Sequence, residues 1–429
     1  MKNKSAIYYA LILLGLTLIT QMFSSYNYSY YVDEIALISL QQASIAKIIF
    51  LLFDAGNDVL FGYLSEKFSF KLGKRKTWLI FGLPLFCVAF FFTFAIDAET
   101  TLSNSQVLIY YIFITITFDN FSSLLYVNHS ALFPVLFSND EERTKASSFN
   151  RFLEIIGTGI VFISAPILKE KLGYMTTCVI YIVLFLCVMT IALMNLKEPV
   201  DKTPLQKQTK FNFRQALKDV RKNKSFLWYM ISSASFLTIL GTLITILPFL
   251  VKYTMKITGT EQTIVTAIGF LCVAVSFKGW ALLIKKKGHR YAYKMSFILL
   301  PIITFLLGSS FNFWSTLIAF TISMPFVGGM LMTPDLMMAD IIDEDFRKHH
   351  IRREAALMSM ASFVRRFSLL IAAVLIMLIS SFCGYQDGSN PGTNPELSFR
   401  LITMVFLPCV ACIGTIASQI YLKLSASQN

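Results

Sequence analysis

Asp54-Ala55-Gly56-Asn57-Asp58 places two carboxyl groups and an amide inside an apolar run that extends from Ile45 to Leu64. The run has the length of about 20 residues that a helix needs to cross a bilayer. Asp54 lies near its middle, where a charge costs roughly 2.5–3.5 kcal/mol on insertion scales. Acids at that depth are rare and usually serve a function, so the stretch predicts a membrane-spanning helix with a polar site.

The polar residues of this stretch share one helical face. Asp54 and Asp58 are one turn apart, with Cβ atoms about 5–6 Å from each other, and Asn57 follows Asp54 by three residues. Two carboxylates and an amide oxygen on one face can bind a small hard cation or share a proton. The alternative is a polar patch that only contacts a neighbouring helix. We expect this site to hold Na⁺ or H⁺, and we expect no structural metal or other cofactor.

The composition indicates a polytopic membrane protein. Of 429 residues, 55% are hydrophobic and only 15% are charged. The net charge of +13 does not predict nucleic-acid binding, because the basic residues fall between apolar segments and form no single patch. The seven cysteines are scattered, and Cys409-Val-Ala-Cys412 lies in an apolar run, which predicts packing rather than redox or metal chemistry.

Twelve apolar segments predict an all-α membrane protein with twelve transmembrane helices. Lys2 and Lys4 precede an apolar run to about Tyr31, which is too long for a signal peptide and predicts the first helix. The expected spans are 6–31, 43–64, 77–95, 105–137, 149–168, 174–196, 225–251, 262–284, 291–311, 313–339, 355–383 and 398–423.

The charges of the connections predict the orientation. Three connections are rich in lysine and arginine: 64–76, 285–294 and 340–354. The alternate connections hold acids instead: 32–42, 96–104 and 384–397. Basic connections stay in the cytoplasm, so we expect both termini there and the protein in the plasma membrane.

The longest connection, residues 197–224, carries nine basic residues. Its apolar residues are spaced like one face of a short helix on the inner leaflet, although the segment can equally be a solvated linker. It divides the chain into 1–196 and 225–429, with six expected spans each. Beyond this division the sequence shows no residue-level repeat.

A basic turn follows the acidic stretch after Gly62, with the sequence Gly73-Lys74-Arg75-Lys76-Thr77-Trp78. Stretch and turn together resemble the second helix and following loop of the melibiose-permease family, the glycoside-pentoside-hexuronide:cation symporters of the major facilitator superfamily. The resemblance implies the major facilitator fold, with two six-helix bundles around a central cavity. It also places the sodium or proton site on Asp54, Asn57 and Asp58.

A second signature lies after the tenth expected span. Ala339-Asp340-Ile341-Ile342-Asp343, followed by Arg352-Arg353-Glu354, resembles the "ADxxD…RxE" pattern of the same family. Mixed acids and bases suit an intracellular ion-pair network that opens and closes, although a static surface network is the equal alternative. The expected members of this gate are Lys74, Arg75, Asp340, Asp343 and Arg353.

Two arginines lie about ten residues into the eleventh expected span, Arg365 and Arg366. At 1.5 Å per residue they reach about 15 Å into the membrane, where a buried arginine needs a carboxylate partner. The family carries a lysine in this helix, and the resemblance matches it to Arg366. Arg365 can instead face a loop or a neighbouring helix, and a pairing that serves assembly alone is the alternative for both.

Polar residues in the first and fourth spans predict a wall of the cavity. Asp119 lies mid-span, and Gln21 and Tyr26 belong to a polar and aromatic stretch that can bind a sugar or an amphiphile. The alternative for that stretch is an interfacial aromatic belt. His129 can relay protons, but a single membrane histidine more often bonds to a neighbouring helix.

The resemblance weakens at the sugar-binding positions. Tyr126 stands where sugar-transporting members hold an aspartate, and Ser130 stands where they hold a stacking tryptophan. Arg151 does match the family. The cation residues are therefore kept, whereas the residues that recognise galactosides are not, which puts a classical disaccharide substrate in doubt.

These observations favour cation-coupled symport of a sugar or related small organic solute by alternating access. The rival solute is a lysophospholipid or another amphiphile, and a non-transporting sensor on the same fold is a further alternative. The sequence holds no nucleophile–base pair, metal-ligand cluster or phosphate loop, so we expect no enzyme. The expected partners are the solute and the lipid bilayer, and we expect a monomer.

Overall fold

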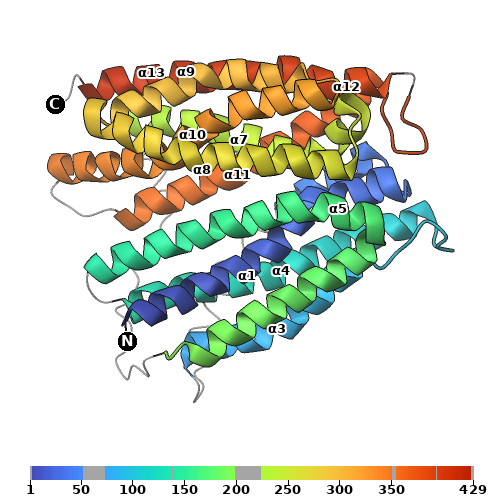
Figure 1. The fold of residues 1–429 in the computed structure, drawn as a ribbon, viewed down its shortest axis with the longest axis horizontal. Coiled ribbons are helices and arrows are strands. Elements are labelled where there is room, and N and C mark those ends of the chain that lie inside the picture. Colours follow the sequence, from blue (N-terminus) through green and yellow to red (C-terminus); the bar gives the residue numbers. More distant parts are fainter. Residues whose placement is uncertain are drawn as a thin grey trace. The chain divides into compact units, whose positions relative to one another are not determined.

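The computed structural model describes residues 2–51, 73–137, 140–198, 224–349, 354–392 and 394–426. Every regular element in those ranges is a helix (Figure 1). The acidic stretch 54–58 and most of the connection 197–224 lie outside the described residues, so the predictions made for them stay predictions.

The chain divides into two compact units, the first made of Met1–Pro204 with Gln386–Asn390 and the second of Leu205–Tyr385 with Pro391–Asn429. Hydrogen bonds tie Gln386–Asn390 to the first unit, because Gly388 N donates to Val32 O at 2.8 Å and Leu40 N donates to Gln386 O at 2.6 Å. The predicted bundles 1–196 and 225–429 remain a prediction, since the connection between them is not described.

The first unit contains long helices that the structure joins in pairs. Its elements are α1 (Lys2–Ser29), the π-helical turn η1 (Tyr30–Glu34), α3 (Lys74–Thr93), α4 (Asn104–Leu136) and α5 (Asp140–Asn195). Helix α1 packs along α5, and α3 packs along α4. Gly173 has φ 78° and ψ 170°, which breaks α5 at the predicted boundary between the fifth and sixth spans.

The second unit holds the remaining elements. They are α7 (Lys224–Phe249), η2 (Leu250–Met255), α8 (Gly259–Lys287), α9 (His289–Gly308), α10 (Phe313–His349), α11 (Glu354–Cys383), α12 (Pro395–Leu401), η3 (Ile402–Phe406) and α13 (Leu407–Ala426). Helix α10 packs against α8 and α9, and α13 packs against α7 and α9.

In these ranges nine helical elements are long and apolar enough to cross a membrane. They cover ten of the predicted spans, because α5 contains two of them. The second span is described only as a short apolar helix from Leu40 to Leu51, and α11, the predicted eleventh span, is not among the nine.

Each unit repeats two local features of the other. The first helix of each unit ends in a π-helical turn, η1 after α1 and η2 after α7. The third expected span of each unit begins after a glycine in the same rare backbone conformation, with φ 107° and ψ 149° at Gly73 and φ 83° and ψ 159° at Gly288. Only glycine adopts that conformation without strain. The structure thus reveals a repeat that the sequence analysis missed.

Tyrosines of η1 satisfy the end of α3. The last carbonyl groups of a helix lack partners within the helix. The Tyr31 hydroxyl donates to Thr93 O at 2.8 Å, and the Tyr30 hydroxyl donates to Phe94 O at 3.4 Å and to Ile96 O. These bonds join the end of the first span to the end of the third.

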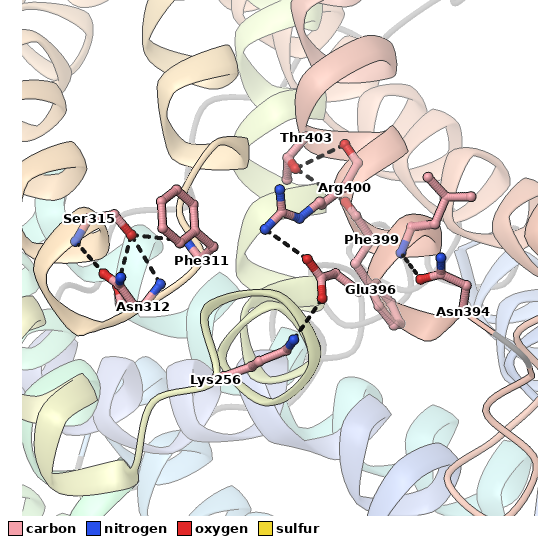
Figure 2. Close-up of polar contacts among 10 residues, drawn as sticks. Lys256, Phe311, Asn312, Ser315, Asn394, Glu396, Phe399, Arg400 and Thr403 are labelled. Carbon is pink, nitrogen blue, oxygen red and sulfur yellow. Dashed lines mark hydrogen bonds and ion pairs between the residues drawn. The ribbon is translucent and has the colours of Figure 1, made fainter.

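One carboxylate joins two elements of the second unit. Figure 2 shows Glu396, at the start of α12, between Lys256 at the end of η2 and Arg400 one turn further along the chain. Both cations lie 2.8 Å from its oxygens. The hydrogen bond from Lys256 lowers the pKa of the Glu396 carboxyl, which lies ahead of the predicted twelfth span.

We predict that Glu396→Gln destabilises the protein at pH 7 by about 1 kcal/mol, the upper range for partly exposed ion pairs. A carboxyl with a lowered pKa contributes stability above its unfolded pKa and loses it as the pH falls. The gap in melting temperature from wild type should therefore close in acid. Glu99→Gln, at an exposed acid, is the control, and an equal loss there would contradict the assignment.

Candidate functional site

The predicted cation residues Asp54, Asn57 and Asp58 lie outside the described residues. The structure does describe how the short helix before them, Leu40–Leu51, is held. The Tyr28 hydroxyl of α1 donates to Leu40 O at 3.1 Å and also bonds to Ser44. Lys47 lies over the Tyr28 ring, with Nζ 5.6 Å from its centroid. Helix α1 therefore anchors the short helix Leu40–Leu51, which precedes the acidic stretch in the chain.

Helix α4 presents a polar stripe toward α1. The stripe residues recur every three or four positions, so they share one helical face; they are Tyr111, Thr115, Asp119, Ser122, Tyr126 and Ser130. Three contacts fix the pairing with α1 and with the η1 turn that follows it. The Tyr126 hydroxyl lies 3.2 Å from Thr20 Oγ1, the Phe23 and Phe118 rings stack at 3.8 Å, and the Tyr31 and Tyr111 rings lie 4.8 Å apart.

The stripe is open along part of its length. Tyr111 and Thr115 are buried, whereas Asp119 and Tyr126 are half-buried and Ser130 is exposed. Gln21 on α1 is also half-buried, and its Oε1 atom is buried with no hydrogen-bond partner among the described residues. A buried acceptor without a partner costs about 1–3 kcal/mol. The predicted residues Gln21, Asp119, Tyr126 and Ser130 thus belong to two facing helices, and Gln21 offers an acceptor to a donor group.

Tyr26 lies apart from this stripe. Its ring is buried against Tyr174, with the two centroids 6.1 Å apart. Lys169 lies over both rings, with Nζ 5.2 Å from the Tyr26 centroid and 5.4 Å from the Tyr174 centroid. These contacts place Tyr26 between α1 and α5, where it joins the two helices.

Arg151 and His129 make local contacts in the first unit. The Arg151 guanidinium is 60% exposed and pairs with Glu154 at 3.1 Å, one turn along α5. The His129 ring stacks on Tyr9 at 4.1 Å, and its Nε2 lies 3.1 Å from Tyr9 O. This contact fits the interpretation of His129 as a bond between neighbouring helices.

The two arginines of α11 differ in exposure. Arg365 is exposed, whereas Arg366 is half-buried, just before the buried Ser368. The choice of Arg366 over Arg365 and its pairing with the acidic stretch both stay predictions.

In the first unit, the predicted basic turn meets an acid that the sequence analysis did not select. The Glu198 carboxylate accepts from Arg75 N at 3.1 Å and from Lys76 N at 2.8 Å, at the N-terminus of α3. In return, Lys76 Nζ donates to Leu196 O at 2.9 Å, just past the end of α5. A side chain at Gly73 would overlap the Glu198 carboxylate. We call these contacts the α3–α5 clasp.

In the second unit, Asp340 of the second predicted gate signature makes a contact that corresponds to the α3–α5 clasp. Asp340 Oδ2 lies 2.8 Å from His289 Nε2 and 3.1 Å from Arg290 Nε, and these contacts form the α9–α10 clasp. Neither base was selected from the sequence, although both belong to the basic connection 285–294. The side chains of Lys74 and Asp343 and the whole of Arg353 lie outside what the structure describes.

Comparison with known proteins gives one family over nearly the whole chain. The family described as MFS/sugar transport protein matches residues 8–426. A sodium-dependent lysophosphatidylcholine symporter of Gallus gallus is 20% identical over 91% of this chain and 81% of its own length. An isoprimeverose transporter of Lactiplantibacillus pentosus is 24% identical over 84% of this chain and 76% of its own length. The corresponding match in Mus musculus, at 28% identity, spans only 25% of that symporter.

Solved structures share the fold. A bacterial homologue of the human peptide transporters PepT1 and PepT2 aligns over the full length of both chains, with a TM-score of 0.68 and 13% identity. A bacterial homologue of the lysosomal transporter Spinster aligns over 98% of both chains, with a TM-score of 0.62 and 12% identity. The predicted all-α major facilitator fold is thereby confirmed.

We predict that Glu198→Ala destabilises the protein by about 1–2 kcal/mol, as expected for the loss of a helix cap. Lys76→Met should have a smaller effect, because it removes one donor and leaves the α3 cap in place. Thermal unfolding of purified protein measures both. Lys197→Ala, at the exposed neighbour, is the control and should leave the melting temperature unchanged; a silent Glu198→Ala would contradict the capping role.

Proposed function

The chain belongs to the MFS/sugar transport protein family, and we propose on this premise that it is a cation-coupled symporter of a small polar solute. It is an integral membrane transporter of the major facilitator superfamily. The proposed cycle is alternating access by rocking of the two halves, with both termini in the cytoplasm and the protein in the plasma membrane. We further propose that it acts as a monomer.

The polar stripe of α4 and its facing side of α1 carry the proposal of a polar solute. A polar face inside a membrane bundle is costly unless its groups are paired within the protein, line water or bind a ligand. Here Asp119 and Tyr126 are half-buried and Ser130 is exposed, so the stripe is accessible along this part. Its carboxylate, hydroxyl and amide groups suit a solute with several hydroxyl groups. The name of the Lactiplantibacillus pentosus relative, an isoprimeverose transporter, supports a sugar-like solute.

Cation coupling rests on the acidic stretch and on the relatives. Asp54, Asn57 and Asp58 provide oxygen ligands of the kind that Na⁺ accepts, or carboxyl groups that share a proton. The lysophosphatidylcholine symporters are named as sodium-dependent. In the proposed cycle, the ion stabilises the state that accepts solute, and Arg366 competes for the carboxylates when the ion is absent.

A lysophospholipid is the second candidate solute. The match to the Gallus gallus symporter covers 91% of this chain, which is more than the match to the isoprimeverose transporter covers. The absence of the family's sugar-binding aspartate and tryptophan, at Tyr126 and Ser130, also favours it. The polar stripe favours the sugar-like solute, which we therefore place first.

Uptake into proteoliposomes tests the proposal directly. Isoprimeverose and lysophosphatidylcholine are offered in parallel, each with an imposed Na⁺ gradient, with an imposed H⁺ gradient and with neither. We expect gradient-dependent accumulation of isoprimeverose. Accumulation of lysophosphatidylcholine alone would select the second candidate, and accumulation of neither solute, under any gradient, would contradict symport of these classes.

We predict that Asp54→Asn and Asp58→Asn each abolish accumulation against a gradient. Either change removes one carboxylate from the ion site but keeps the side-chain shape. Equilibrium exchange of solute should partly survive, because solute contacts are separate, and stability should not fall, because a buried charge is removed. Accumulation and exchange are measured side by side for each variant. Normal accumulation in both would remove the acidic stretch from its assigned role.

We predict that Gln21→Leu raises the KM for isoprimeverose roughly tenfold, the effect of losing one hydrogen bond of about 1.4 kcal/mol. The melting temperature should stay the same or rise, because a buried unpartnered acceptor is removed. Gln419→Leu is the matched control, since Gln419 in α13 also has a buried amide atom without a partner among the described residues. That variant should leave KM unchanged. An equal KM for Gln21→Leu and wild type would show that Gln21 does not bind the solute.

A further inference from the structure

The loop between α11 and α12 has a tip, residues Gln386–Asn390, that belongs to the first unit. Two backbone hydrogen bonds dock this tip. Gly388 N donates to Val32 O at 2.8 Å, and Leu40 N donates to Gln386 O at 2.6 Å. Val32 lies in η1, and Leu40 begins the short helix before the acidic stretch. The tip is therefore bonded to the end of the first expected span and to the chain that leads into the second.

Hydrogen bonds within the tip hold its shape. Asp387 Oδ1 accepts from Ser389 N at 3.0 Å, from Ser389 Oγ at 2.6 Å and from Asn390 N at 2.8 Å. Gln386 N also donates to Asn390 O at 3.3 Å, and Asn390 Nδ2 donates to Gln386 Oε1 at 3.0 Å. Aspartate side chains commonly close turns by such bonds to the following backbone. The tip can therefore leave its docking site as one piece.

Two glycines form a narrow neck around the tip. Gly384 has φ 74° and Gly392 has φ 77°, a conformation that glycine adopts without strain. A side chain at Gly392 would lie 2.8 Å from Gly384 O, so the two sides of the neck run close together. Hinges are formed by a few loop residues, often small ones, that absorb large changes of φ and ψ. The neck has the properties of such a hinge.

The residue just before the tip is fixed in the second unit. Tyr385 is fully buried, and its ring centroid lies 5.0 Å from Phe399, 5.6 Å from Tyr253 and 6.0 Å from Phe249. Consecutive Cα atoms are only 3.8 Å apart, so the chain has no spare length between Tyr385 and the tip. A movement of the second unit away from η1 therefore pulls on the two docking bonds.

We propose that the tip is a latch that closes the outer end of the transporter while it is docked. The outer end is the side opposite the termini, where the acid-containing connection 384–397 is predicted to lie. Rocking of the two halves separates their outer ends, so the latch has to detach when that side opens. The inference rests on the proposed function, in which the halves rock.

Gly388 makes the docking possible. A side chain at this position would overlap the backbone oxygen of Asp33 in η1, and a backbone atom cannot turn aside as the end of a side chain can. The φ angle of Gly388 is not positive, so the backbone itself accepts alanine. Gly388→Ala therefore undocks the tip by one methyl group. Gly279→Ala in α8 is the matched control, because nothing lies within 4 Å of the methyl group that it adds.

Two measurements follow the latch. Hydrogen–deuterium exchange of the Leu40 amide in purified protein reports docking, because this amide donates to Gln386 O. Opening is followed through Ser122→Cys, on the polar stripe of α4, which is labelled with a membrane-impermeant thiol reagent outside intact cells. The same protein without Ser122→Cys gives the background from the native cysteines.

We expect Gly388→Ala to speed exchange at Leu40 about tenfold, as for the loss of one protecting hydrogen bond. Labelling of Ser122→Cys from outside should rise about fivefold, the size of a modest coupling. Gly279→Ala should match wild type in both measurements. Asp387→Ala loosens the tip from within and should act in the same direction, so the test stands even where Gly388→Ala fails to fold.

Two results would overturn the inference. Unchanged exchange at Leu40 in both tip variants would show that the tip is not docked in this way. Faster exchange with unchanged labelling would show that the docked tip does not close the outer end. Uptake by wild type decides the proposed function separately: absence of uptake together with the expected changes in exchange and labelling would overturn symport and support the latch.

Discussion

The hydrocarbon core of a bilayer offers no water, so every backbone polar group must be satisfied within the protein. Helices meet this demand along their length but leave four donors and four acceptors at their ends. In the first unit, other segments supply partners for both ends of α3. Glu198 accepts from its first N–H groups, and the hydroxyls of Tyr30 and Tyr31 bond near its last carbonyls. Helix ends therefore determine which segments of this unit are joined.

The same constraint gives meaning to polar side chains within the spans. Thr17, Thr93 and similar buried hydroxyls donate to the carbonyl one turn earlier and so cost little. The stripe of α4 differs, because Tyr126 bonds across to α1 and Asp119 is half-buried in mid-span. Polar groups that join two helices or lie half-buried in mid-span are candidates for contact with a ligand or with water. This is why the stripe, and not the larger number of buried hydroxyls, carries the proposal about the solute.

The two units hold the start of their third expected span through different chemical groups. Gly73 and Gly288 place a basic turn at the start of corresponding helices, and each turn meets an acid from elsewhere in its unit: Glu198 just past the end of α5, and Asp340 on α10. The first acid, Glu198, binds backbone groups whose charge is constant. The second acid, Asp340, binds a histidine and an arginine through one oxygen. The repeat lies more in the backbone conformation than in the sequence. Lys74 corresponds to His289, and from the glycine to the third residue after it only the glycine and the arginine are the same in both units.

The sequence by itself determined ten of the twelve expected spans, those that the described helices cover, because membrane insertion depends on local runs of apolar residues. It also placed a boundary between residues 168 and 174, where α5 breaks at Gly173. It also selected Asp340 and the basic turn at Arg75, through resemblance and charge. It could not select Glu198 or His289. Nor could it show that Tyr26 packs against α5, whereas Gln21 has a buried acceptor without a partner among the described residues. These assignments depend on which faces of helices distant in the chain meet, and hydropathy carries no such information. Tertiary structure alone decided that Arg75 meets an acid 123 residues away, whereas Tyr26 packs under Lys169.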